Sequence, residues 1–175
     1  MNNTGESSVD LAMAGNDWEQ SLSQRDRRSV VFHLLYLAES YEYSGSVPSF
    51  ADNLNRGFDL SISLNGPLVA IAEQVVDRRD ELDTTYQPLL ANWRLERLSV
   101  CTKLILRYAV WELLHTDTNP TIVINEAIEL AKAYAEKDSY KLVNGLLDQL
   151  VKQRGLKREP IANQQDPEVP EQTTV

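Results

Sequence analysis

Few side chains in this 175-residue chain have the type and spacing that catalysis or metal binding needs. Glu112 and His115 are separated by two residues, which is the spacing of a ligand pair in di-metal carboxylate bundles. Such a centre needs a second pair of the same kind, and the other histidine, His33, has Val30 at the matching position. The sequence therefore predicts no metal site.

Patterns typical of nucleophilic or nucleotide-dependent enzymes are also missing. Cys101, the single cysteine, lies on the apolar face of a predicted helix, where burial raises the pKa of a thiol and makes it inert. The chain contains neither a glycine-rich phosphate loop nor a Gly-x-Ser-x-Gly nucleophile turn. We therefore predict a protein that is not an enzyme and that binds no cofactor.

The first predicted helix combines arginines and aromatic residues in a pattern that suits single-stranded RNA. At about 100° per residue, Arg25 and Arg28 lie on one side of this helix, opposite its main apolar face. Phe32 and Tyr36 fall on the same side. Guanidinium groups neutralise phosphates, and ring faces stack on unpaired bases. The alternative is that this helix is buried on both faces and that its arginines are only solvated.

Apolar residues recur at helical spacing along most of the chain, and strand-like alternation is absent. Asn119 and Pro120 have the pattern of a helix start, a capping residue followed by proline at the first helical position. Gly155 is suited to end the last helix. We expect an all-α fold of about seven helices. They are predicted over residues 24–43, 49–58, 68–81, a short buried segment near 89–93, 98–115, 120–135 and 138–154.

The two ends of the chain have the composition of solvated tails. The net charge is −9, but residues 1–23 and 156–175 carry four acidic residues each, so the middle of the chain is closer to neutral. Such segments bury too little apolar area to offset their ordering entropy. We predict disordered acidic tails over residues 1–23 and 156–175 and one helical domain over 24–155. No signal-peptide or membrane-spanning pattern is visible, so we expect a cytoplasmic protein.

The second half of the chain carries three runs whose order and spacing are specific. They read KLILRYAVWELL over residues 103–114, PTIVINEAIELAK over 120–132, and DS at 138–139 followed by LVNGLLD over 142–148. These runs closely resemble the bacterial NusB family, and the first half matches more loosely through Arg28 and the pair Leu35-Tyr36. The resemblance implies an all-helical fold of two three-helix lobes. It also implies a role in transcription antitermination, chiefly on ribosomal RNA operons.

The same resemblance implies partners. We expect the chain to bind boxA-like RNA together with the NusE-type small-subunit ribosomal protein, in contact with the transcription elongation complex, and a homodimer is an open alternative. RNA contacts are expected at Arg25, Arg27, Arg28, Phe32, Asp138, Lys141 and Leu142. Contacts with the protein partner are expected at Tyr36, Thr102, Lys103 and Arg107.

Several residues allow a structural interpretation beside the functional one. Asp138 and Lys141 lie at the predicted start of the last helix, where free backbone N–H groups favour phosphate, and an ordinary helix start capped by Asp138 is the alternative. Arg107 and Glu112 form either a polar pair or separate anchors between lobes. Two other functions stay open. One is a helical interaction or oligomerisation module that has lost RNA binding, and the other is a stand-alone NusB-like domain acting in trans with an RNA methyltransferase.

Overall fold

The computed structural model describes residues 17–90 and 94–157 of the chain. Every regular element in these two ranges is helical, which confirms the all-α prediction. A helical turn at residues 17–21 comes first. It is followed by α2 (Gln24–Ser40), α3 (Val47–Phe58), α4 (Pro67–Asp77), α5 (Arg79–Tyr86), the short 3-10 helices η1 (Gln87–Leu90) and η2 (Leu95–Arg97), α6 (Val100–His115), α7 (Pro120–Tyr134) and α8 (Ser139–Arg154). No helix within the described ranges is long and apolar enough to cross a membrane.

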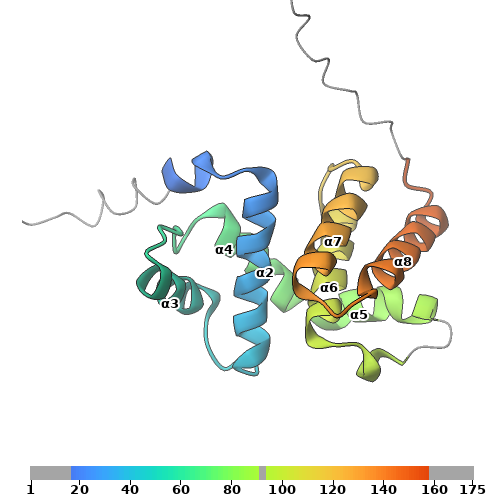
Figure 1. Cartoon of the computed structure of the whole chain (residues 1–175), viewed down its shortest axis with the longest axis horizontal. Helices are drawn as coiled ribbons and strands as arrows, with labels where there is room; N and C mark the ends of the chain where they lie inside the picture. Colours follow the sequence, from blue (N-terminus) through green and yellow to red (C-terminus); the bar gives the residue numbers. More distant parts are fainter. Residues whose placement is uncertain (1–16, 91–93, 158–175) are drawn as a thin grey trace, which may run out of the picture.

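The helices form two lobes that lie side by side (Figure 1). The first lobe contains residues 17–21, α2, α3 and α4, and the second contains α5 to α8. Helix α6 packs against α5, α7 and α8 in its own lobe and against α2 in the other. Because it has neighbours on all sides, α6 is buried continuously from Leu104 to Leu113. Together α2 and α6 form the centre of the molecule.

Most helix starts are capped by side chains close in sequence. At α7 the side chain of Asn119 accepts a hydrogen bond from the backbone N–H of Thr121 (2.9 Å), and Pro120 follows, as the sequence predicted. The same kind of cap is supplied at α2, α3 and α6 by Ser23, Ser46 and Ser99. Helix α8 ends at Gly155, whose φ of 64° lies in the left-handed region that glycine adopts without a steric penalty. These local predictions are therefore confirmed.

The single helix predicted over residues 68–81 is corrected by the structure. The chain turns at Arg78, where α4 ends, and α5 then begins at Arg79 and continues to Tyr86. Leu82 continues the apolar periodicity across this turn and is fully buried, so hydrophobic spacing shows no break. The turn directs the chain from the first lobe into the second (Figure 1).

Residues 17–23 pack on the folded domain, whereas the sequence analysis assigned them to a tail. Trp18 and Leu22 contact the hydrophobic core. Glu19 is 2% exposed, and its carboxylate accepts a hydrogen bond from the backbone N–H of Ser63 (2.8 Å). Burial raises the pKa of the Glu19 carboxyl. The remaining parts of the predicted tails, residues 1–16 and 158–175, lie outside the described residues, as does Trp93.

Candidate nucleic-acid interface

Arg28 lies inside the molecule and not on an exposed stripe. Its Nε donates to Oε2 of Glu112 on α6 (3.1 Å), and its Nη2 pairs with the other oxygen of the same carboxylate. Phe32, one turn further along α2, is only 3% exposed. The prediction that these two side chains face RNA is therefore corrected. Helix α2 is buried on both sides because it packs against α4 and α6, which is the alternative that the sequence analysis left open.

Two of the four predicted partner contacts are also interior. Thr102 is 2% exposed, and the side chain of Arg107 is 9% exposed. Arg107 donates two hydrogen bonds to Asp83 on α5 (2.8 and 2.7 Å) and one to Glu39 on α2 (2.9 Å). Arg107 and Glu112 are therefore separate anchors and not a pair. Charges this close to the core must be paired, because an unpaired charge there is costly.

Tyr36 and Lys103 keep accessible side chains, as contacts with a partner require. Tyr36 is 43% exposed, and Lys103 is partly exposed. Lys103 lies one turn before Arg107 on α6, and its positive charge acts on Glu39. The two accessible residues of the predicted partner site thus come one from each lobe.

Tyr134, the last residue of α7, supplies the exposed ring that the sequence analysis assigned to Phe32. Its ring stacks on Phe32 with the centroids 4.9 Å apart, and its hydroxyl lies 2.8 Å from the hydroxyl of Ser29. His33 meets the same ring edge-on at 5.1 Å. Tyr134 itself remains 38% exposed. The sequence alone does not mark Tyr134 as exposed, because it follows Leu130 by four positions, the spacing expected of a core residue.

Exposed cations continue from this aromatic cluster across α7 and α8. Arg25 donates from Nε and Nη2 to the carboxylate of Glu126 (3.2 and 3.0 Å), and its side chain is 60% exposed. Near the end of α7, Glu129 pairs with Lys132 (2.9 Å). Nζ of Lys132 lies 5.6 Å from the centroid of the Tyr140 ring, and Nζ of Lys141 lies 5.9 Å from it. We call the surface formed by Arg25, Glu126, Glu129, Lys132, Tyr134, Tyr140 and Lys141 the α2–α7–α8 strip.

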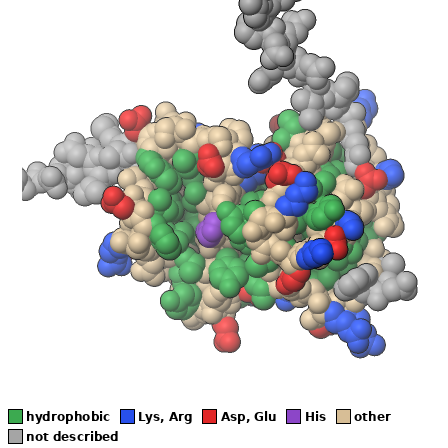
Figure 2. Space-filling model, viewed as in Figure 1, with side chains coloured by type: hydrophobic (Ala, Val, Ile, Leu, Met, Phe, Trp, Pro, Cys, Tyr) green, Lys and Arg blue, Asp and Glu red, His purple; other side chains and the backbone are tan. Residues whose placement is uncertain are grey.

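Charged and hydrophobic side chains are divided between the two lobes on the face shown in Figure 2. Lys, Arg, Asp and Glu are interspersed over the half that holds α7 and α8, and hydrophobic side chains gather over the half that holds α2 and α3. Because cations and carboxylates alternate, the strip is a row of ion pairs and not a uniformly positive patch.

The predicted cap at the start of α8 is wrong. Asp138 has a φ of 69°, in the left-handed region, and its side chain caps no backbone N–H. The carboxylate instead pairs with Nζ of Lys141 (3.0 Å). This hydrogen bond raises the pKa of Lys141, whose side chain is 64% exposed. Leu142 is half-buried against the core, so less of its side chain is accessible to RNA than expected.

Arg27 contacts the N-terminal turn and not the strip. Its Nη2 donates to the backbone carbonyl of Gln20 (3.3 Å), and the carboxylate of Glu19 interacts with its charge. Of the three arginines expected to contact RNA, only Arg25 thus lies on the α7 side of the first lobe with an exposed guanidinium.

Comparison with known proteins decides the family. The model of the NusB family matches residues 25–152. The chain belongs to the NusB family. It is 42% identical over 134 residues to the transcription antitermination protein NusB of Staphylococcus aureus (strain JH9), an alignment covering 75% of this chain and 100% of that protein. The NusB protein of Staphylococcus carnosus (strain TM300) is 32% identical over 130 residues, covering 74% and 99%.

A shorter alignment and a solved structure agree with this assignment. The NusB protein of Staphylococcus haemolyticus (strain JCSC1435) is 46% identical over 76 residues, and the chain spans only 59% of that relative. A structure of T. maritima NusB superposes with a TM-score of 0.65 at 28% identity, covering 75% of this chain and 92% of that one. The range matched by the NusB family model contains every residue of the α2–α7–α8 strip, whereas the N-terminal turn with Glu19 lies before it.

Proposed function

We propose that this NusB-family chain is a transcription antitermination factor that binds boxA-like single-stranded RNA of ribosomal RNA transcripts and catalyses no reaction. The observation that supports the proposal is the α2–α7–α8 strip. Three helices contribute its three cations, Arg25, Lys132 and Lys141, and its two rings, Tyr134 and Tyr140. Proteins recognise single-stranded RNA with cations that contact its phosphates and with aromatic rings on which its bases stack.

The carboxylates of the strip do not prevent binding. Exposed ion pairs contribute only about 0–1 kcal/mol each, so a phosphate can replace Asp138 beside Lys141 at little cost. The side chain of Glu126 is only 17% exposed and stays paired with Arg25, so a phosphate binds there on the exposed side of the guanidinium. The exchange releases counterions from the RNA, and affinity therefore falls as salt rises. Competition between carboxylates and phosphates tunes the affinity without abolishing it.

We further propose that the NusE-type small-subunit ribosomal protein is the protein partner and that the pair joins the transcription elongation complex in the cytoplasm. Tyr36 and Lys103 are the accessible residues expected to face it. An exposed aromatic residue surrounded by polar groups is a frequent anchor of protein interfaces. Thr102 and Arg107 act in this proposal only by holding α6 in place, because both are buried.

Fluorescence anisotropy of a labelled boxA-containing leader RNA, measured at several salt concentrations, tests the proposed function. Each phosphate contact on a single strand contributes about −0.7 to the slope of log K against log salt. Changing Arg25 and Lys141 together to Ala should therefore flatten the slope by about 1.4. An unchanged slope with a folded double variant, or the absence of RNA binding by the wild-type protein with its partner, would contradict the proposal.

Arg56→Ala is the matched control for this measurement. Arg56 lies on α3, which is on the opposite side of the molecule from α7 and α8 (Figure 1), and it pairs with Asp52 (2.5 Å). Its side chain is 72% exposed. The control removes the same charge from a similar surface ion pair, so it should leave the salt slope unchanged.

A further inference from the structure

A cavity of about 210 Å³ lies between the two lobes, and none of the strip residues lines it. It is bounded by the start of α2, the start of α4 and the end of α6 with the segment that follows. Its lining includes Arg27, Ile71, Tyr108, Trp111 and Thr118. Pockets for drug-sized ligands have volumes of about 300–1,000 Å³, so this cavity has room for a group the size of one or two rings.

Two buried hydrogen-bond donors in the lining have no acceptor among the described residues. They are Nε1 of Trp111 and Nε of Arg27. Trp111 is 5% exposed and belongs to the cavity lining, and its indole N–H is buried. Buried donors almost always have an acceptor in folded proteins. The third unpaired buried atom is an acceptor, Oε2 of Glu19, whose carboxylate interacts with the charge of Arg27, so Arg27 has a counterpart within the protein. The indole N–H of Trp111 has no such counterpart, which indicates that a ligand with an acceptor atom belongs in the cavity.

The charge and shape of the cavity narrow the class of ligand. The positive charge of Arg28 is balanced by Glu112, and that of Arg27 is offset by Glu19, so the lining offers no large excess of positive charge. An anion would gain little there. The side chains of Trp111 and Tyr108 supply aromatic walls. Apolar residues of α4 and the uncharged polar residues Gln24, Thr116 and Thr118 complete the lining. The lining thus fits a flat, uncharged ring that accepts hydrogen bonds.

We propose that this interlobe cavity is a nucleobase site that takes one base extruded from the bound RNA strand. The carbonyl oxygens or ring nitrogens of the base accept hydrogen bonds from Trp111 Nε1 and Arg27 Nε. The inference rests on the proposed function, which supplies the RNA. It adds a site at which the protein reads one base, whereas the strip contacts phosphates and stacks on bases without reading their edges.

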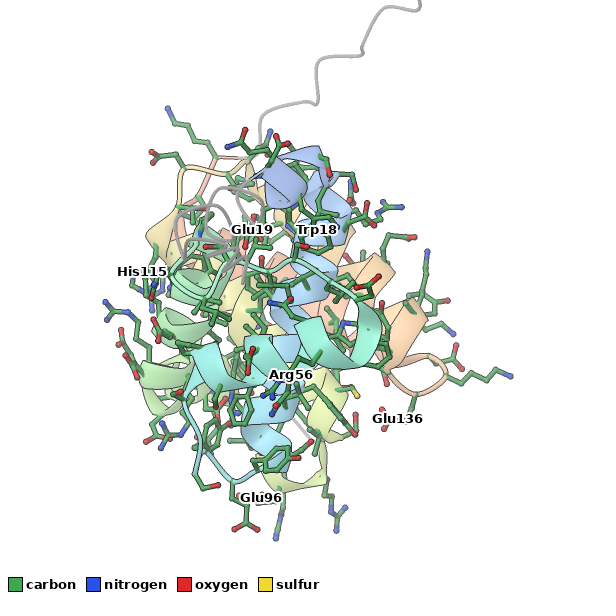
Figure 3. All side chains as sticks on the ribbon, turned by 90° about the vertical axis from the view of Figure 1, so that its left-hand side faces the viewer. Trp18, Glu19, Arg56, Glu96, His115 and Glu136 are labelled. Atoms are coloured by element: carbon green, nitrogen blue, oxygen red, sulfur yellow. The ribbon has the colours of Figure 1, made fainter. Side chains whose placement is uncertain are left out.

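Arg25 and the cavity share the N-terminal end of α2. Arg25 and Arg27 are two residues apart at the start of α2, with Arg25 paired to α7 and Arg27 lining the cavity. Residues two apart on a helix point to nearly opposite sides, so a strand whose phosphate contacts Arg25 must cross the N-terminal end of α2 to reach the cavity. The end of α6 at His115 and the N-terminal turn at Glu19 lie toward this same end of the molecule (Figure 3). The N-terminal turn therefore borders the approach to the cavity.

An abasic scan of the leader RNA tests the inference on the full chain with its protein partner. Each nucleotide in turn loses its base, and affinity is measured for the wild-type protein and for Trp111→Phe, which keeps a ring but removes the indole N–H. We expect one abasic position to weaken binding by about ten-fold, in the range for losing one stacked and bonded base. Trp111→Phe should weaken binding of intact RNA by about five-fold and binding of that abasic RNA by less than two-fold, because the two changes remove the same contact.

Arg27→Lys separates this site from the strip. Lysine keeps the positive charge but has no N–H at the Nε position, so the salt slope should stay unchanged while the penalty at the same abasic position shrinks. The indole N–H resonance of Trp111, assigned by its loss in Trp111→Phe, should shift on adding intact RNA but not the abasic RNA. Free uridine at millimolar concentration is the second arm. A shift of the Trp111 indole resonance with uridine alone would support the inference, because it would show that the cavity binds a free nucleobase as well as one that belongs to an RNA strand.

Results that overturn the inference are distinct from those that overturn the proposed function. If RNA binds with the expected salt slope but no abasic position couples to Trp111 and the indole resonance stays in place, the cavity holds no base while the strip still binds RNA. If the wild-type protein and its partner bind no RNA, both fail. Helical circular dichroism and the melting temperature of Trp111→Phe show that the variant is folded before its affinity is compared.

Discussion

Arg107 on α6 joins the second lobe to the first through Glu39 on α2, with Nη1 of the arginine 2.9 Å from Oε2 of the carboxylate. The same guanidinium holds Asp83 on α5 with two further hydrogen bonds, and the hydroxyl of Tyr43 bonds to both Glu39 and Arg107. Burial and the bond to Glu39 raise the pKa of Tyr43 to about 12. One arginine thus fixes three helices relative to one another, α2 in the first lobe and α5 and α6 in the second.

Removing this arginine should destabilise the whole domain. We expect Arg107→Ala to lower the free energy of unfolding by about 3 kcal/mol, because it leaves the largely buried carboxylates of Asp83 and Glu39 without a partner. Arg107→Lys should recover only part of the loss, since a single ammonium cannot form the paired hydrogen bonds to Asp83. Urea denaturation measures both. The exposed control Arg56→Ala should change stability by less than about 0.5 kcal/mol. An equal effect of Arg56→Ala and Arg107→Ala on the free energy of unfolding would contradict the view that the ion pairs of Arg107 stabilise the domain.

The pairing of Glu39 predicts a loss of stability in acid. Burial alone would raise the pKa of this carboxyl, but the hydrogen bonds from Tyr43 and Arg107 outweigh burial and lower it. A carboxyl with a lowered folded-state pKa contributes stability above its unfolded pKa, and the contribution is lost as the pH falls through the folded pKa. Glu39→Gln should therefore be less stable than the wild type at pH 7, and the difference should shrink below about pH 4.

Thermal unfolding of the wild type and of Glu39→Gln between pH 7 and pH 3 gives this difference directly. Glu73→Gln is the control, because Glu73 is an exposed carboxylate on α4. Its difference from the wild type should stay small at every pH. A Glu39→Gln difference that is constant across the range would show that the stabilising pair does not depend on the charge of Glu39.

Asp138 is expected to hold Lys141 back from RNA. Asp138→Asn should leave the melting temperature nearly unchanged, because asparagine tolerates the left-handed backbone about as well as aspartate does. A carboxylate about 8 Å from a phosphate costs roughly 0.5 kcal/mol in a water-like dielectric, so the variant should bind RNA about two-fold more tightly at low salt. The gain should shrink as salt rises. Asp59→Asn is the matched control, since Asp59 also has a left-handed φ, 53°, at the end of α3. An unchanged affinity of Asp138→Asn would place the RNA elsewhere.

Tyr36 is expected to act at the protein partner and not in the core. Its ring is 43% exposed, so Tyr36→Ala should cost less than about 1 kcal/mol of unfolding free energy, well below the 3–5 kcal/mol typical of buried aromatic residues. Affinity for the purified NusE-type ribosomal protein should fall by about five-fold or more in calorimetry. Tyr41→Ala removes a ring that is 56% exposed just past the end of α2, and it should leave that affinity unchanged. Equal losses for the two variants would remove Tyr36 from the interface.

The sequence by itself determined the features that depend on residues close together in the chain. The helical spacing of apolar residues predicted an all-α fold, and the cap at Asn119 and the end at Gly155 were read correctly because their hydrogen bonds close within a few residues. Asp138 is the exception among these local features. The same carboxylate can cap a backbone N–H or pair with Lys141, and its left-handed backbone selects the ion pair. The family was visible in the order and spacing of runs along α6, α7 and α8.

Only the tertiary structure decided which side chains meet across the lobes. Arg28 is 84 positions from Glu112, and Arg107 is 68 from Glu39, so no spacing rule shows which arginine takes which carboxylate. A helical wheel placed Arg25 and Arg28 on one stripe. The wheel does not show that α2 packs against α3, α4 and α6, or that side chains of α7 meet it. Packing of these helices buries Arg28 and Phe32, exposes Tyr134 in place of Phe32, and leaves Arg25 at the surface. Whether a helix face is buried depends on the elements that pack against it in the folded protein, and those elements come from distant parts of the chain.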